Sequence, residues 1–197
     1  MMSGTYDILG WVMTALTMSN GGLHYNPEYG GEVYYDSPFM LGALTFCDDL
    51  IHKYKVHPDG VTQTPAMNSA LFADQAAMIV SSTGSLSFIR QNMKLLYKVT
   101  FVPKNLRNVV AIGGASLVIP EGNSNEREQA AWRLIKWLTS PEIASQWSRF
   151  AGYFAANKAT YELPEMKDFL AKYPDAKVAL DQLVFKRPGL QQPTRSR

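Results

Sequence analysis

Strand-like apolar runs alternate with helix-like stretches along this 197-residue chain, and this alternation restricts its fold more than any other feature. Compact or alternating apolar runs at 76–80, 97–103, 109–112 and 117–119 are typical of strands. Helical patterns lie between and after these runs. The interleaving of the two patterns predicts an α/β fold.

Several helices are expected to begin at a hydroxyl residue followed by proline. The side-chain oxygen caps a free N–H group, and proline fits the first helical turn because that position needs no donor. The pairs are Ser37-Pro38, Thr64-Pro65 and Ser140-Pro141. Cys47 falls on the apolar stripe of the first of these helices, so we expect a buried, unreactive thiol. Further helices are expected over 5–18, 164–173 and 175–185.

The clearest helical pattern follows residue 124. Asn125 with Glu128 resembles a capping box, which predicts the start of this helix. Apolar residues then recur at helical spacing and predict a buried face. This face consists of Ala131, Leu134, Ile135 and Leu138. We also expect the tryptophans of this helix and the next to lie mostly in the core, namely Trp132, Trp137 and Trp147.

Composition excludes several classes of function. Lys and Arg number 19 against 17 Asp and Glu, so the chain lacks the basic field by which proteins hold nucleic acid. A single cysteine makes no intramolecular disulfide and no cysteine-rich zinc site. No run approaches the roughly 18 apolar residues of a membrane span. The first residues lack the pattern of a signal peptide, and both ends predict a piece of a longer protein.

Four places offer binding chemistry. The turn Ser82-Thr83-Gly84-Ser85 collects hydroxyl and N–H groups suited to an anionic or polyhydroxylated ligand, or it only caps a helix. Gly113 and Gly114 allow close approach of a ligand or of another strand. Tyr153 follows the expected stop of a helix at Gly152 and either projects into a cleft or packs beneath a loop. Trp11 lies near an expected edge of the fold.

The residues favour holding a ligand over converting it. No GxSxG motif is present, and the histidines have no partner motif for activating a hydroxyl. Acidic residues do not have metal-ligand spacing. We therefore expect no catalytic activity, no metal and no cofactor. An α/β hydrolase or transferase that uses the turn at 82–85 remains the alternative.

Three motifs together resemble a known family. They are MIVSSTGSLSFIR (78–90), IGGASLVIPEG (112–122) and AAWRLIKWLTSPEIASQWSRFAGYFAANKATYE (130–162). Their order and spacing resemble the extracellular solute-binding proteins of ABC importers, the group that includes maltose-binding protein. The resemblance is greatest to the glycerol-3-phosphate-binding branch.

The resemblance implies a type II periplasmic-binding fold, with ligand bound between two lobes and no catalysis. Residues 1–95 and 140–197 would belong to the C-terminal lobe, and 96–139 to the N-terminal lobe. Family members are about twice this length, so the chain is expected to be a truncated fragment that holds mostly the C-terminal lobe. A remnant that no longer transports is a second alternative.

The resemblance also implies ligand contacts and partners. Leu23 and His24 stand where the branch has a stacking aromatic residue, so Trp11 or Tyr25 would stack instead. The expected partners are a sugar or glycerol phosphate, ABC permease subunits and, through the truncated lobe, a second copy. The expected location is periplasmic or extracellular, at the membrane through the transporter. The expected ligand-binding residues are Trp11, Ser82, Thr83, Ser85, Gly113, Gly114 and Tyr153, with Arg195 and Arg197 as phosphate candidates.

Overall fold

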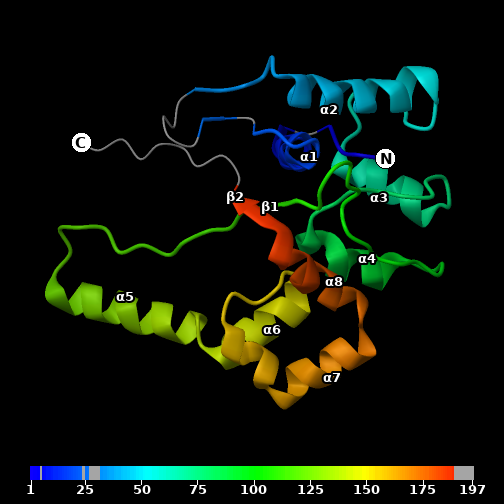
Figure 1. Cartoon of the computed structure of the whole chain (residues 1–197). Helices are drawn as coiled ribbons and strands as arrows, with labels where there is room; N and C mark the ends of the chain where they lie inside the picture. The colour runs from blue at the N-terminus through cyan, green and yellow to red at the C-terminus, as the bar shows by residue number, and fades with distance from the viewer. Residues whose placement is uncertain (5, 24, 27–31, 189–197) are drawn as a thin grey trace. The chain divides into compact units, whose positions relative to one another are not determined.

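The computed structural model describes residues 1–4, 6–23, 25–26 and 32–188 (Figure 1). They form two compact units, each made of segments distant in sequence. Unit 1 comprises Met1–Ser82, Met93–Gly113 and Asp181–Arg197. Unit 2 comprises Thr83–Asn92 and Gly114–Leu180.

The helices of unit 1 follow their local signals. Helix α1 (Tyr6–Ser19) packs against α2 (Pro38–Asp48), which a π-helical turn, η1 (Asp49–Lys53), extends. The Ser37 hydroxyl accepts a hydrogen bond from the Met40 N–H at 3.3 Å, which confirms the predicted cap. Helix α3 spans Thr64–Phe72 and so begins at the Thr-Pro pair, as predicted, but its N-cap is Gln63 and no side chain caps it. These starts are local because the proline and the cap act within one turn.

A two-stranded parallel sheet lies in unit 1. Strand β1 (Val110–Ile112) pairs with β2 (Lys186–Pro188), so that Val110 stands opposite Lys186. Helix α1 packs against β1. The sheet joins segments about 75 residues apart, which a sequence pattern alone does not reveal.

Only one of the four predicted strands is confirmed, that over 109–112. In the described residues, 97–103 and 117–119 have no strand pairing, and the run at 76–80 makes only an isolated bridge between Val80 and Met2. A strand requires a hydrogen-bonded neighbour as well as a suitable pattern. The predictions were wrong because they read the pattern without the neighbour.

The carboxyl end of α1 is held by a loop. Backbone N–H groups of Leu106 and Arg107 donate to the Ser19 carbonyl at 3.0 and 3.3 Å, and the Arg107 guanidinium donates to the Met18 carbonyl at 2.8 Å. The last carbonyls of a helix have no partner within the helix. This loop therefore satisfies groups that would otherwise need water.

Cys47 is half-buried and lines a cavity of about 210 Å³ within unit 1. Leu44 and Tyr54, which belong to its predicted apolar stripe, are exposed, while Met40 is buried. The expected buried stripe is therefore only partly correct. Burial raises the pKa of the Cys47 thiol, because the charged thiolate is poorly solvated there.

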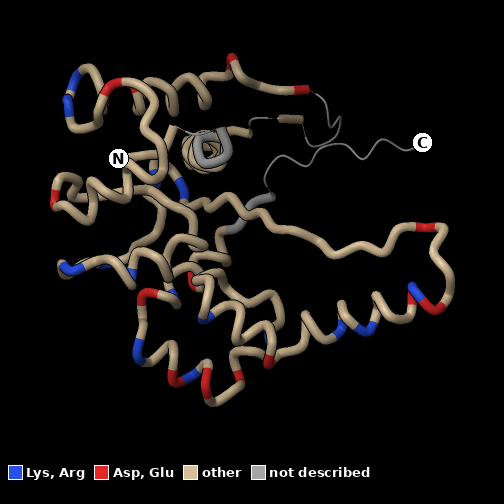
Figure 2. The backbone as a smooth tube through the Cα atoms, turned by 180° about the vertical axis from the view of Figure 1, so that it is seen from behind, with Lys and Arg blue, Asp and Glu red and all other residues tan. Residues whose placement is uncertain are grey.

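Unit 2 is helical. Its elements are η2 (Thr83–Ser85), α4 (Leu86–Asn92), α5 (Asn125–Leu138), α6 (Pro141–Ala151), η3 (Lys158–Glu162), α7 (Pro164–Lys172) and most of α8 (Asp175–Gln182), after which η4 (Leu183–Phe185) follows in unit 1. Helix α6 packs against α4 and α7. Figure 2 shows Lys and Arg interspersed with Asp and Glu along these helices, in keeping with the small net charge.

An ion pair joins α4 to the start of α8. The Arg90 guanidinium lies 3.0 Å from the Asp175 carboxylate, and both side chains are largely buried. The same guanidinium stacks over the rings of Tyr173 and Phe169, at 4.5 and 5.5 Å from their centroids. Removing one partner of such a buried pair leaves an uncompensated charge, which costs about 3–5 kcal/mol.

Helix α5 differs from its prediction in two ways. Its cap is Ser124, whose hydroxyl accepts from the Arg127 N–H at 3.5 Å, rather than Asn125. None of its residues is buried, so the expected buried face is wrong within this structure. The tryptophans expected in the core are also more than half exposed: Trp132, Trp137 and Trp147. In the described residues, no helix is both long and apolar enough to cross a membrane.

We predict that Gly152→Ala destabilises the chain more than Gly122→Ala does. Both glycines have left-handed φ angles, +97° and +87°, which cost a side chain about 1–2 kcal/mol. A Cβ at Gly152 would also lie 2.9 Å from the Ser87 nitrogen and the Thr83 carbonyl oxygen, whereas a Cβ at Gly122 would meet nothing within 4 Å. Urea unfolding should show an additional loss of at least about 1 kcal/mol for Gly152→Ala. Equal losses would contradict this packing.

We predict that the Cys47 thiol reacts slowly with a disulfide reagent at neutral pH. Its raised pKa lowers the thiolate fraction, and the thiolate is the reacting form. The pH midpoint of the reaction rate should lie above that of the same chain unfolded in urea. Identical midpoints in the two states would contradict the burial of this thiol.

Candidate ligand-binding site

Two predicted site regions meet within unit 2, at Gly84 and Tyr153. A Cβ built on Gly84 would lie 2.3 Å from Cζ and 2.4 Å from the hydroxyl oxygen of Tyr153. No side chain fits in that space, so the tyrosine ring lies directly over the glycine backbone. We call this arrangement the tyrosine–turn contact. It brings Tyr153 to the turn that carries Thr83 and Ser85.

The end of α6 aims Tyr153 at this turn. Gly152 caps the helix in a left-handed conformation, and its N–H donates to the Ser148 carbonyl at 2.9 Å. The Ser148 hydroxyl in turn donates to the Tyr153 carbonyl at 2.5 Å. Gly152 itself lies against the backbone of the turn, at Thr83 and Ser87. The tyrosine backbone is therefore fixed from both sides, while its side chain stays 47% exposed.

A second aromatic ring lies over glycine within unit 1. A Cβ on Gly113 would lie 2.1 Å from Cη2 and 2.6 Å from Cζ2 of Trp11. We call this the tryptophan–glycine contact. Trp11 comes from α1 and Gly113 directly follows β1, and these two elements pack together. The Trp11 side chain remains 39% exposed, so part of the indole is available to a ligand.

The remaining predicted residues are less constrained. Ser82 is exposed and belongs to unit 1, whereas Thr83 and Ser85 are half-buried in unit 2. Gly114 has open space where a Cβ would lie. Tyr25 pairs with Val33 in an isolated antiparallel bridge. His24, Arg195 and Arg197 lie outside the described residues.

Sequence reasoning missed the glycines that make these contacts possible in unit 2. Gly84 was read only as part of a hydroxyl-rich turn, and Gly152 only as a helix stop. The available signal was that Gly84 directly follows Thr83 and Gly152 directly precedes Tyr153, both of which were predicted site residues. A third ring, that of Phe39, lies over Gly22 in unit 1, at the turn that ends α1.

In each contact an aromatic ring lies beside polar groups. These are backbone groups at Gly113, and backbone groups together with the hydroxyls of Thr83 and Ser85 at the turn. Ligand sites typically combine aromatic surfaces with a few placed polar groups. The two described histidines are otherwise engaged: His52 lies 3.5 Å from Asp48, and His57 accepts a hydrogen bond from the Met2 N–H at 2.9 Å. Among the described residues, no three His, Cys, Asp or Glu side chains gather into a possible metal site.

Comparisons with known proteins identify the family of this chain. Residues 10–177 match the family described as bacterial extracellular solute-binding protein. The sn-glycerol-3-phosphate-binding periplasmic protein UgpB of Yersinia pestis is 33% identical over 125 residues, which are 61% of this chain and 28% of the relative. UgpB of Escherichia coli O1:K1 is 34% identical over 117 residues, 57% of this chain and 27% of the relative.

Solved structures show the same fold. UgpB of Mycobacterium tuberculosis, in complex with glycerophosphocholine, matches 95% of this chain with a TM-score of 0.83 and 25% identity, and 46% of its own length is covered. Maltose-bound MalE3 of T. maritima matches 95% of this chain with a TM-score of 0.75 and 26% identity, and 49% of its length is covered. The chain thus spans about half of these structures and under a third of the curated relatives.

These matches confirm the expected α/β class and the type II periplasmic-binding fold, of which the chain contains a part. They also explain why the helices outnumber the paired strands, since about half of the fold is outside the chain. The family match covers 168 of 197 residues and includes every described site residue. The chain belongs to the bacterial extracellular solute-binding protein family.

Proposed function

We propose that this protein is the substrate-binding component of an ABC importer and that it binds a glycerol phosphate or a sugar without converting it. The tyrosine–turn contact supports this most directly. It unites within one unit an exposed aromatic ring and a hydroxyl-rich turn, both of which the family resemblance implicates. The tryptophan–glycine contact offers a second aromatic surface in the other unit.

The chemistry suits a polyhydroxylated ligand. Apolar ring or carbon faces of such a ligand pack on aromatic side chains, while its hydroxyl and phosphate oxygens need donors. Thr83 and Ser85 carry hydroxyls in the turn that Tyr153 contacts, and a Cβ at Gly114 would meet nothing within 4 Å, so a ligand has room beside the backbone there. Neither interaction requires a metal ion or a nucleophile.

Between the two ligand classes, the comparisons favour a phosphate-bearing glycerol derivative. The curated relatives at 33–35% identity are glycerol-3-phosphate-binding proteins, and one solved neighbour holds glycerophosphocholine. Maltose is held by a neighbour with a lower TM-score. We therefore place sn-glycerol 3-phosphate and glycerophosphocholine first among candidate ligands.

The proposal extends to partners and location. The protein would deliver its ligand to ABC permease subunits, and it would act in the periplasm or outside the cell. Residues 1–95 and 140–197 would belong to the C-terminal lobe of the whole protein, and 96–139 to its N-terminal lobe. Self-association of the chain is a further expectation, because a partial fold leaves apolar surface in water.

The alternatives differ in support. A hydrolase or transferase is not favoured, because the relatives are binding proteins rather than catalysts. A remnant that no longer transports remains the second alternative. Ligand binding distinguishes the remnant from the proposed transport component.

We expect calorimetry of the full chain to detect saturable binding of sn-glycerol 3-phosphate or glycerophosphocholine. Tyr153→Ala should weaken this binding about tenfold, a loss of about 1.4 kcal/mol. Phe150→Ala is the matched control, because Phe150 is also an exposed aromatic residue at the end of α6 and lies outside the tyrosine–turn contact. No heat with either ligand or with maltose would overturn the proposal and favour the remnant.

We expect Gly113→Ala to weaken ligand binding more than Gly114→Ala. The new methyl group at Gly113 would displace the Trp11 ring, whereas the one at Gly114 would enter open space. The indole is partly exposed and can rotate away, so stability should change little. Calorimetry with the same ligand, together with Trp11→Ala, measures the effect. Equal affinities of the two glycine variants would exclude a role for the Trp11 position.

A further inference from the structure

Residues 152–155, which carry Tyr153 away from the end of α6, form neither helix nor strand in the structure. We call them the tyrosine segment. Backbone N–H and C=O groups need hydrogen-bond partners when they are shielded from water, so this segment depends on partners outside itself. The Ser148 hydroxyl is one of them, because it donates to the Tyr153 carbonyl at 2.5 Å. This bond holds the tyrosine segment from the side of α6.

The hydroxyl of Tyr161 is the second partner of the tyrosine segment. Its oxygen accepts a hydrogen bond from the Ala155 N–H at 2.9 Å, and its proton is donated to the Ala155 carbonyl at 3.1 Å. A phenol can make both bonds because its hydroxyl is a donor as well as an acceptor. Ala155 is only 8% exposed, so water has little access to its backbone groups. One side-chain hydroxyl therefore satisfies both backbone groups of a buried residue.

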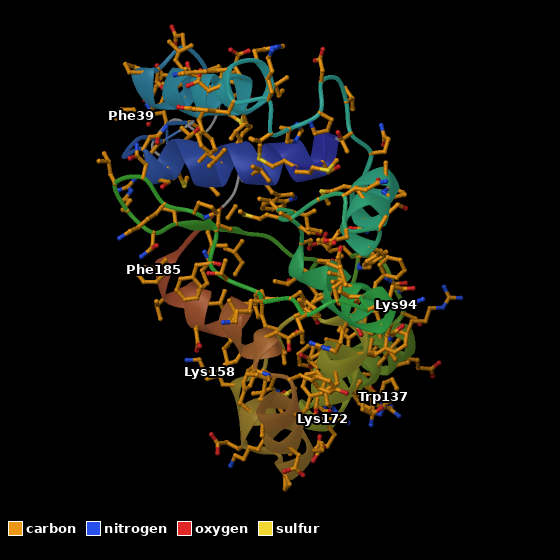
Figure 3. All side chains as sticks on the ribbon, turned by 90° about the vertical axis from the view of Figure 1, so that its right-hand side faces the viewer. Phe39, Lys94, Trp137, Lys158, Lys172 and Phe185 are labelled. Carbon is orange, nitrogen blue, oxygen red and sulfur yellow. The ribbon has the colours of Figure 1, made fainter. Side chains whose placement is uncertain are left out.

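Tyr161 is itself fixed within unit 2. It lies in η3, which begins at Lys158 (labelled in Figure 3) and packs against α6 and α7. Asn157 caps η3 by accepting a hydrogen bond from the Ala159 N–H at 3.1 Å, and its amide donates to the Thr139 carbonyl at 2.9 Å. Thr139 lies two residues before α6 begins. Tyr161 therefore stands on an element that is anchored at the opposite end of α6 from the tyrosine segment.

These bonds bear on Tyr153 because a single residue separates it from Ala155. Ser148 fixes the Tyr153 carbonyl on one side, and Tyr161 fixes Ala155 on the other. A backbone fixed on both sides leaves its side chain few directions in which to project, because side chains occupy a small set of rotamers. The tyrosine–turn contact needs one particular direction, in which the ring takes the place of a Cβ on Gly84.

We propose that Tyr161 is a positioning residue of the ligand site, which acts through Ala155 to hold the ring of Tyr153 over Gly84. Tyr161 does not touch the ligand, and its whole effect on binding passes through Tyr153. The effect on affinity rests on the function proposed above. The effect on the place of the Tyr153 ring does not, so the two are measured separately.

The first measurement uses the full chain without ligand. A Cβ on Gly84 would meet the Tyr153 ring, so one α proton of Gly84 points at this ring and should give a nuclear Overhauser contact with its protons. Tyr161→Phe removes the hydroxyl and keeps the packed ring. We expect this variant to keep the helix content of the wild type in circular dichroism and to lose the contact between Tyr153 and Gly84.

Thr160→Val is the matched control for this measurement. Thr160 is a fully buried neighbour of Tyr161 in η3, and its hydroxyl donates to the Pro141 carbonyl at 3.2 Å rather than to the tyrosine segment. The control should therefore keep the contact between Tyr153 and Gly84. Retention of this contact in Tyr161→Phe, or its equal loss in both variants, would overturn the proposal. A Tyr161→Phe chain that does not fold would do the same, since it would assign Tyr161 to stability alone.

The second measurement is calorimetry with sn-glycerol 3-phosphate and with glycerophosphocholine. Tyr161→Phe should weaken binding about fivefold and Thr160→Val less than about twofold, as expected for residues inside and outside one hydrogen-bond network. In a Tyr153→Ala background, Tyr161→Phe should change the affinity less than about twofold, because no ring remains to be positioned. A merely structural role would weaken binding equally in both backgrounds, and that result would overturn the proposal.

The two measurements separate the failure of this proposal from the failure of the proposed function. If the wild-type chain binds neither ligand, the proposed function fails, and the contact between Tyr153 and Gly84 alone decides whether Tyr161 positions the ring. If the chain binds a ligand and Tyr161→Phe binds it as tightly as the wild type does, the function stands and Tyr161 has no positioning role.

Discussion

The absence of a Cβ atom at three glycines is the constraint on which the candidate site depends. Gly84 and Gly113 let the rings of Tyr153 and Trp11 lie against the main chain. Each ring fills the space that the Cβ of any other residue would need. Gly152 adds a left-handed turn that brings α6 onto the backbone of residues 83–87. Both rings remain partly exposed, at 39% for Trp11 and 47% for Tyr153, so each keeps surface on which a ligand can stack.

Besides the tyrosine–turn contact, unit 2 contains a largely buried ion pair. The pair Arg90–Asp175 lies mostly out of water, and the guanidinium is further enclosed by the rings of Phe169 and Tyr173. Arg90 lies in the last turn of α4, while the turn at Thr83–Ser85 directly precedes this helix. The short helix is therefore held at both ends, by α6 and Tyr153 on one side and by the α7–α8 region on the other.

The partial fold explains the main departures from expectation. Strand patterns at 97–103 and 117–119 are present without paired neighbours in the described residues, and the amphipathic α5 is present without a buried face. The chain spans 46% of the solved UgpB structure that it matches. In the described residues, the predicted strands at 97–103 and 117–119 and the predicted buried face of α5 were therefore wrong, whereas the predicted helix at α5 was confirmed.

The sequence by itself determined features that act within one helical turn or one motif: the starts at Ser37-Pro38 and Thr64-Pro65, the stop at Gly152, and the family. It also singled out Tyr153 and the turn that precedes α4. Only the tertiary structure decided that Tyr153 lies over Gly84 and Trp11 over Gly113. Those contacts join segments about 70 and 100 residues apart, and a local pattern contains no information about which distant backbone will leave room for a ring.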